Sequence, residues 1–154
     1  MDSKTFAKQF LLLEVEKMKA VDVRLQLLAA IIHGIETSGA LLDSLPFKAK
    51  GQGKKRFDLA LTKLFPADYL VVNNQLNLYS QLRSHMAHCM LPAKTIHFKM
   101  NNPELHLKHV DGLLYISLEA LYNDYRWAVL QIIEKLEAKE LKNKRIIFEN
   151  LGEL

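Results

Sequence analysis

The spacing of apolar residues along this chain is mainly helical. Apolar positions recur every three or four residues over most of the sequence, which is the pattern of amphipathic helices. The segments that show this pattern are 4–20, 22–42, 54–64, 66–91 and 117–136. Over 95–117 the spacing changes to two, which predicts a small β-hairpin or a three-stranded flap. The sequence therefore predicts a mainly α fold, a helical bundle of about five helices with this small β flap before the last long helix.

The ends of these segments carry residues that begin helices and turns. Asp2 or Ser3 can cap the first helix, Asp22 the second and Ser117 the last. Asp111-Gly112 is a dipeptide typical of a two-residue hairpin turn.

The same spacing predicts which side chains face the core. The predicted inward positions are Phe6, Phe10, Leu13, Val23, Leu27, Ile31, Ile35, Phe57, Leu61, Leu64, Val72, Leu76, Tyr79, Leu82, Met86, Met90, Ile96, Phe98, Leu105, Leu107, Leu113, Tyr115, Leu118, Leu121, Tyr125, Val129, Ile132 and Leu136. A row of small residues, Ala30, Gly34 and Ser38, allows another helix to approach closely. Alternatively, Gly34 merely weakens its helix.

Length and composition describe an ordinary globular chain. Its 154 residues predict one domain, 1–154, with a charged tail from about Lys142 that is less ordered until Ile146-Ile147-Phe148. The net charge of +4 and pI of about 9.1 are compatible with a polyanionic partner. The single cysteine excludes an internal disulfide. We expect a cytoplasmic protein, because the N-terminus lacks a signal-peptide pattern and no uncharged run is long enough for a membrane span.

Arg83 and His88 offer the most distinctive chemistry in the chain. A guanidinium holds phosphate through several donors, and a histidine exchanges protons near neutral pH. Metal-free RNA cleavage needs such groups to activate the 2′-hydroxyl, stabilise the phosphorane and protonate the leaving 5′-oxygen. On an ideal helix, residues five apart lie about 140° apart, so convergence needs the helix to end near His88 or a second subunit. In the alternative, Arg83 pairs with an acid such as Glu36, and His88 stabilises the helix C-terminus.

The segment 78–88, Leu-Tyr-Ser-Gln-Leu-Arg-Ser-His-Met-Ala-His, resembles the diagnostic segment of the HEPN superfamily (higher eukaryote and prokaryote nucleotide-binding domains). There, a leucine–arginine pair is followed by a polar residue, a small residue and the histidine. Residues 112–136 resemble the stretch in bacterial members where a short strand enters the last helix. Residues 35–39 and 55–57 resemble segments of an uncharacterised bacterial subset. The resemblance covers about residues 25–137.

This resemblance implies an all-helical bundle that pairs its motif helices across a homodimer, around a joint cleft. In RNA-cutting members the arginine and the histidine are the catalytic pair, which corresponds to Arg83 and His88 here. Ser84, His85 and Glu36 are the expected supporting residues. We expect neither a metal nor another cofactor.

Ser84 departs from the family pattern, in which Asn, Asp or His commonly follows the arginine; here a histidine comes one position later, as His85. Serine can hydrogen-bond but has neither a charge nor a ring. Two functions therefore stay open. The first is a metal-independent endoribonuclease or toxin-type RNA-processing protein, with an antitoxin as a further partner. The second is a non-catalytic module of the same fold that binds RNA, a nucleotide or another protein.

A basic loop is the second candidate site. Its cations are Lys48, Lys50, Lys54, Lys55 and Arg56. They could grip an RNA phosphate backbone. They could equally form a solvated surface loop. The segment is not a P-loop, because Gly51 and Gly53 lack the required spacing and no Ser or Thr follows the lysine.

The remaining chemistry-bearing residues predict no further site. No standard metal-ligand spacing occurs among His85, His88, Cys89, His97, His106 and His109. Cys89 is expected to be a small core residue. Tyr122 and Trp127 of the last helix are expected to pack in the core or across a dimer.

Overall fold

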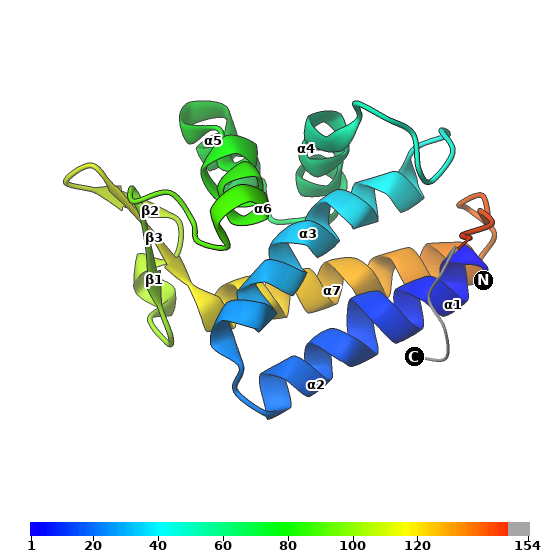
Figure 1. Cartoon of the computed structure of the whole chain (residues 1–154), viewed down its shortest axis with the longest axis horizontal. Coiled ribbons are helices and arrows are strands. Elements are labelled where there is room, and N and C mark those ends of the chain that lie inside the picture. The colour runs from blue at the N-terminus through cyan, green and yellow to red at the C-terminus, as the bar shows by residue number, and fades with distance from the viewer. Residues whose placement is uncertain (148–154) are drawn as a thin grey trace.

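The computed structural model describes residues 1–147. It is a mainly α bundle with a small sheet before the last long helix, as the sequence predicted (Figure 1). Two of its helical turns, η1 and η2, are π-helical, and η3 is a 3₁₀ turn. In chain order the elements are α1 (Ser3–Phe6), η1 (Ala7–Leu13), α2 (Glu14–Ala20), α3 (Arg24–Leu42), α4 (Gly53–Leu64), α5 (Ala67–Leu76), η2 (Tyr79–Ser84), α6 (His85–Cys89), β1 (Ile96–Lys99), η3 (Pro103–Leu105), β2 (Lys108–Val110), β3 (Leu113–Ser117) and α7 (Leu118–Glu137).

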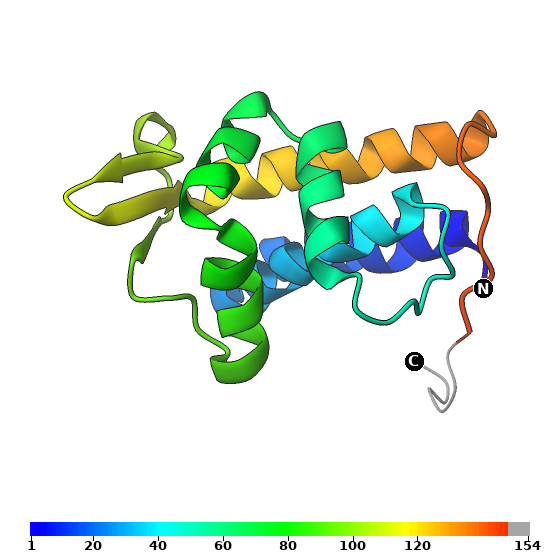
Figure 2. The same cartoon turned by 90° about the horizontal axis from the view of Figure 1, so that it is seen from above.

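Helix α3 lies at the centre of the bundle. It packs against α4, α2 and α7, and ten of its residues are buried. Figure 2 shows α7 and the N-terminal helices extending along the length of the molecule, with the flap at one end. Among residues 1–147, α3 alone is long and apolar enough to cross a membrane, and 56% of its most apolar stretch is buried inside the protein.

Two glycines of α3 mark close contacts with other helices. A Cβ on Gly34 would lie 2.3 Å from the Tyr125 hydroxyl of α7, and a Cβ on Gly39 would lie 1.9 Å from the Arg56 carbonyl oxygen of α4. Ser38 is fully buried. The small-residue row therefore admits a neighbouring helix, as the first of the two interpretations predicted.

A buried charge cluster joins the end of α3 to two other segments. The Asp43 carboxylate accepts hydrogen bonds from Arg56 Nε at 2.7 Å and from Lys144 Nζ at 2.8 Å. Lys144 also donates to the Ala40 carbonyl oxygen. Burial alone would raise the pKa of Asp43, but the hydrogen bonds from both cations outweigh it and hold that pKa below its ordinary value. The α3–α4 loop and the C-terminal segment are thus fixed to one carboxylate.

The first predicted helix forms, but its buried face differs from the prediction. Asp2 caps it by accepting a hydrogen bond from the Thr5 amide at 2.7 Å. The π-helical turn η1 changes the periodicity, so Leu11 and Val15 are buried while Leu13 is exposed. At the start of α3 the prediction was also wrong, because Asp22 has a left-handed backbone and pairs with Arg24 instead of capping the helix.

The helix predicted over 66–91 is interrupted. Asn77 adopts a left-handed conformation with φ of 52° and ends α5, and its side chain accepts a hydrogen bond from the Ser80 amide. Asparagine tolerates this backbone better than other residues with a side chain. The chain then re-enters a helix through η2 and α6, which end at Cys89. Met90, predicted to be buried, is exposed, and so is Cys89.

The flap is a three-stranded sheet in the order β1-β3-β2. Strands β2 and β3 form the predicted hairpin, with positive φ angles at Asp111 and Gly112, and β1 pairs with β3 in parallel. The predicted buried face of β3 was wrong, since Leu114 and Ile116 are buried. Their odd-numbered neighbours face the other side of the sheet. Leu105 and Leu107, predicted as strand residues, lie in η3 and in a left-handed turn.

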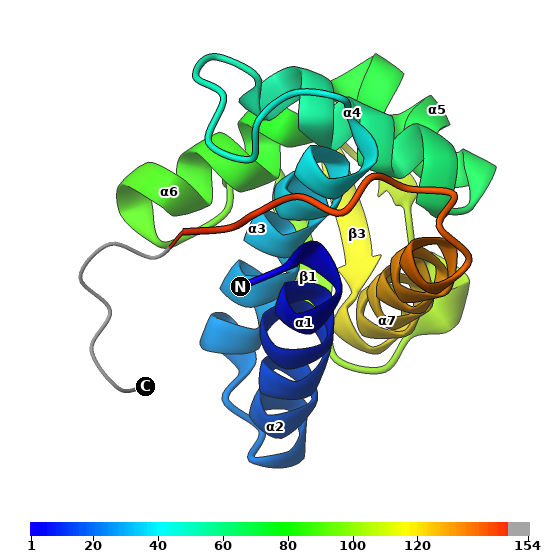
Figure 3. The ribbon, with the colours of Figure 1, turned by 90° about the vertical axis from the view of Figure 1, so that its right-hand side faces the viewer.

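The last helix matches its prediction closely. The Ser117 hydroxyl caps α7 by accepting a hydrogen bond from the Ala120 amide, and the predicted inward positions of α7 are buried. Beyond α7 the chain crosses the end of the bundle and passes the C-terminal end of α3 (Figure 3). Ile146 is buried and donates its amide hydrogen to the Met1 carbonyl oxygen, while Ile147 is exposed. Phe148, predicted to dock with them, lies outside the described residues.

The Tyr125 hydroxyl provides a test of this packing. It is buried without a hydrogen-bond partner among the described residues. Replacing Tyr125 with Phe removes an unsatisfied polar group, so we expect the free energy of unfolding to stay unchanged or to rise by about 1 kcal/mol in urea denaturation. Tyr69→Phe is the matched control, because the Tyr69 hydroxyl is bonded to Asp124 and to His106. It should lower the free energy of unfolding by about 1–3 kcal/mol, and equal losses in the two variants would contradict this account.

Candidate functional site

Arg83 lies in the π-helical turn η2, opposite α3. Leu82 fills the core, and the Arg83 side chain forms an ion pair with Glu36 of α3. The two side chains are 27% and 21% exposed, so the pair sits at the edge of the core. This is the partner that the alternative interpretation of Arg83 predicted.

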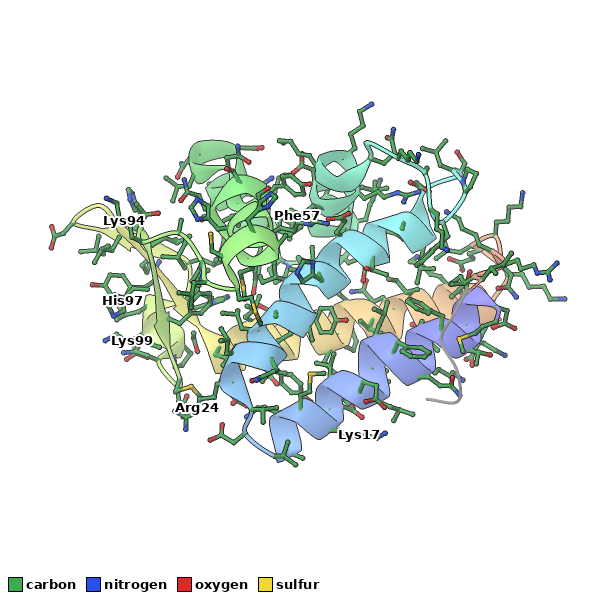
Figure 4. All side chains as sticks on the ribbon, viewed as in Figure 1. Lys17, Arg24, Phe57, Lys94, His97 and Lys99 are labelled. Atoms are coloured by element: carbon green, nitrogen blue, oxygen red, sulfur yellow. The ribbon has the colours of Figure 1, made fainter. Side chains whose placement is uncertain are left out.

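The start of α4 and the Tyr79 ring complete the surroundings of this pair. The Arg83 guanidinium lies 5.8 Å above the centre of the Tyr79 ring. The Tyr79 ring in turn packs edge-on against Phe57 of α4, which lies beside α3 in Figure 4. A Cβ on Gly53 would lie 2.5 Å from the Tyr79 hydroxyl and 3.1 Å from Glu36 Oε1. Three elements that are distant in sequence therefore converge on Arg83.

This arrangement orients Arg83 and leaves part of its guanidinium available. The contact with Glu36 is made through Nε, and the two terminal nitrogens donate no hydrogen bond to any residue within 1–147. A guanidinium held at one edge can still present its other donors to a phosphate. The neighbouring carboxylate offsets part of its charge.

His88 does not meet Arg83 within one chain. His85 and His88 are both exposed on α6, which ends one residue after His88, and neither makes a hydrogen bond or ion pair with any residue from 1 to 147. Ser84 is partly buried between them and Arg83. Convergence of Arg83 and His88 within one chain requires the helix to end near His88, and it does end there. The two side chains nevertheless do not contact each other.

His33 is a residue of this site that the sequence analysis missed. It lies one turn before Glu36 on α3 and is half-buried. Burial, and then the nearby Arg83 charge, lower the pKa of His33, while Glu36 opposes that shift. Within α3, His33 and Glu36 are the ionisable residues that follow Arg24. Their three-residue spacing in an otherwise apolar helix was the available signal.

The basic loop divides into exposed and structural cations. Lys48, Lys50 and Lys55 are exposed and have no ion-pair partner within 1–147. Lys54 pairs with Asp58 at 2.6 Å. Arg56 is buried and satisfied, which makes it unsuited to the phosphate contact predicted for it: besides Asp43, it donates to the carbonyl oxygens of two loop residues.

His106 belongs to a different cluster that fastens the flap to the bundle. Its Nδ1 accepts a hydrogen bond from the Ser117 amide at 3.1 Å, so its proton lies on Nε2, which is 2.8 Å from the Tyr69 hydroxyl. That hydroxyl donates to Asp124 Oδ2 at 2.8 Å. Burial and the adjacent Asp124 raise the pKa of Tyr69, so the phenol keeps its proton. The cluster joins α5, the flap and α7.

The other residues singled out in the sequence do not assemble into a site. Within the described residues, no three His, Cys, Asp or Glu side chains are grouped closely enough to hold a metal ion. Trp127 is 64% exposed, which excludes the core position, whereas Tyr122 is partly buried beneath Lys19.

Comparisons with protein-family models, with curated proteins and with solved structures found no match for this chain. The function of the site is therefore inferred from its own residues.

The His106 cluster makes stability depend on pH. Burial lowers the pKa of His106, ahead of the opposing effects of Asp124 and Asp68. The unfolded chain therefore takes up a proton near pH 6.5, whereas the folded chain takes it up only at lower pH. As a result, the free energy of unfolding decreases when the pH is lowered past about 6.5. We expect His106→Gln to be less stable at neutral pH but to lose less additional stability between about pH 7.5 and about pH 5.5, measured by urea denaturation.

His33 contributes to this pH dependence with the same sign, so the His106 variant keeps part of it. His109→Gln, which changes an exposed histidine of β2, is the control and should retain the wild-type pH dependence. A His106→Gln profile parallel to that of the wild type would contradict the assignment.

Proposed function

We propose that this chain is a cytoplasmic, metal-independent endoribonuclease that works as a homodimer, with Arg83 and His88 as its catalytic pair. One observation carries the proposal: Arg83 is clamped by Glu36 and Tyr79, keeps its terminal nitrogens unbonded, and lies shortly before the exposed His88. A fixed phosphate-binding cation followed by a solvent-facing imidazole supplies charge stabilisation and one proton-transfer group for metal-free RNA cleavage.

The proposed reaction is an internal transesterification. The ribose 2′-oxygen forms a bond to the adjacent phosphorus as its proton passes to a base, and the bond from phosphorus to the 5′-oxygen breaks as that oxygen takes up a proton. His88 serves one of these proton transfers, a water molecule serves the other, and Arg83 stabilises the charge on the phosphorane. Glu36 positions Arg83, and His33 adds a neutral imidazole beside it.

A second copy of the chain supplies the convergence that one chain lacks. Beside His88, Met90 and Leu91 are 65% and 57% exposed. Exposed apolar residues next to a site are typical of interaction surfaces. We propose that this surface packs against its equivalent in a homodimer and brings His88 of one chain to Arg83 of the other.

The alternative is a non-catalytic module that binds RNA, a nucleotide or a partner protein such as an antitoxin. Two observations favour it: Glu36 offsets the charge of Arg83, and Ser84 supplies neither the charge nor the ring that commonly follows the arginine.

Cleavage of a mixed RNA pool in EDTA separates these functions. We expect the wild type to cut RNA and Arg83→Ala and His88→Ala each to reduce the rate by at least about 100-fold, because each removes one part of the chemistry. His109→Ala, which changes an exposed histidine of β2 in the flap, is the matched control and should stay within a few-fold of the wild type. No cleavage by the wild type, or full activity in both variants, would overturn the nuclease proposal.

Complementation tests whether two chains build each site. A heterodimer of Arg83→Ala and His88→Ala chains contains one intact site if the arginine and the histidine come from different chains, and none if they come from the same chain. We expect mixing the two inactive variants to restore up to about half of the wild-type activity per heterodimer. If the two variants exchange subunits and RNA cleavage is still not restored, the shared site is contradicted.

A further inference from the structure

Exposed cations from two distant parts of the chain lie along one side of the molecule. We call them the basic edge. Its members are Lys48, Lys50, Lys55, Lys142 and Arg145. All five side chains are exposed, and none forms an ion pair with a residue in the described part of the chain. Lys142 and Arg145 belong to the C-terminal segment, which was not among the candidate sites of the sequence.

The buried Lys144 places the C-terminal cations beside the loop. Its ammonium group reaches inward to Asp43 and to the Ala40 carbonyl oxygen. The nearby Lys142 and Arg145 are exposed on the surface. Residues 44–47 of the loop and residues 142–145 line the same shallow cleft. The two basic segments are therefore neighbours in the fold, although about ninety residues separate them in sequence.

The basic edge leads to Arg83. The loop ends at Gly53, which packs against the Tyr79 hydroxyl and Glu36. In Figure 2, α6, the start of α4, the loop and the C-terminal segment follow one another along the same side of the molecule.

The acidic groups next to the loop part of this edge are already paired, whereas the exposed Asp2 beside Arg145 caps α1 by accepting a hydrogen bond from the Thr5 amide. Asp43 is bound by two buried cations, Asp58 by Lys54, and Glu36 by Arg83. Within residues 1–147, the exposed charges along the edge are therefore predominantly positive. Such a surface attracts the phosphates of a nucleic acid, whatever its sequence.

We propose that the basic edge binds the phosphate backbone of single-stranded RNA and guides the strand to Arg83. This inference rests on the proposed ribonuclease function and specifies how the RNA substrate is bound. A single strand fits because the attacking 2′-hydroxyl must be able to line up with its phosphate. A membrane is the less favoured partner because the edge runs into the Arg83 site.

Salt dependence of RNA binding tests the proposal. A 2′-O-methyl oligonucleotide, which lacks the attacking hydroxyl, separates binding from cleavage, and its affinity is measured by fluorescence anisotropy. Each phosphate neutralised on a single strand contributes about −0.7 to the slope of log affinity against log salt. We expect Lys142→Ala/Arg145→Ala to flatten this slope by about 1.4 and to weaken binding at low salt about tenfold or more.

The matched control removes two cations from the other end of the molecule. Lys94 and Lys99 are exposed on the flap, remote from the C-terminal segment (Figure 4). Lys94→Ala/Lys99→Ala should bind within about twofold of the wild type, with the same slope. Lys144 is kept in both variants, and equal melting temperatures confirm that both are folded.

Failure of this inference is distinguishable from failure of the proposed function. Equal weakening by both double variants, or no weakening by either, would overturn the basic edge even if the wild type cuts RNA. Edge-dependent binding by a wild type that cuts no RNA would support the edge and overturn the nuclease. Binding to anionic lipid vesicles without binding to the oligonucleotide would overturn the edge as an RNA site.

Discussion

The partly buried carboxylate of Asp43, which is held by two buried cations, is the constraint on which the arrangement of this protein depends. A buried charge is tolerated only when other charges and hydrogen bonds compensate its lost hydration, and removing one partner of such a cluster costs about 3–5 kcal/mol. Asp43 meets this need with Arg56 from α4 and Lys144 from the C-terminal segment. Arg56 also binds the loop carbonyl groups, so one carboxylate fixes the loop, the first turn of α4 and the segment around Lys144. These parts carry the exposed lysines of the basic edge.

The same constraint reaches the candidate site through α4. Fixing the first turn of α4 places Gly53 against Tyr79 and Glu36, and these two residues hold Arg83. Glu36 has opposing effects, because it orients the guanidinium and also offsets its charge. A site of this kind binds a phosphate well when further cations lie near it. We propose that the basic edge supplies those cations, which would link the loop and the C-terminal segment to the proposed chemistry.

The parts of the fold that the sequence predicted correctly are set by local interactions. Ser117 caps α7 and Asp111-Gly112 turns the hairpin because each depends on backbone geometry within a few residues. The errors arose where periodicity was altered or where partners were distant. The left-handed Asn77 breaks a helix whose apolar spacing continues across it. For the site, the sequence indicated Arg83 and its partner Glu36, but His33 was missed and Arg56 was taken for a surface cation, because only packing reveals burial.

The sequence by itself determined the mainly α class, the small flap before the last helix, and the residues capable of chemistry. These follow from hydrophobic spacing and from side-chain type, which are properties of the chain alone. Only the tertiary structure decided which cations are buried with Asp43, which lie free along the basic edge, and what surrounds Arg83. That division has a physical reason: a charged side chain acts according to its distance from other charges and from water, and those distances are set by segments far apart in the sequence.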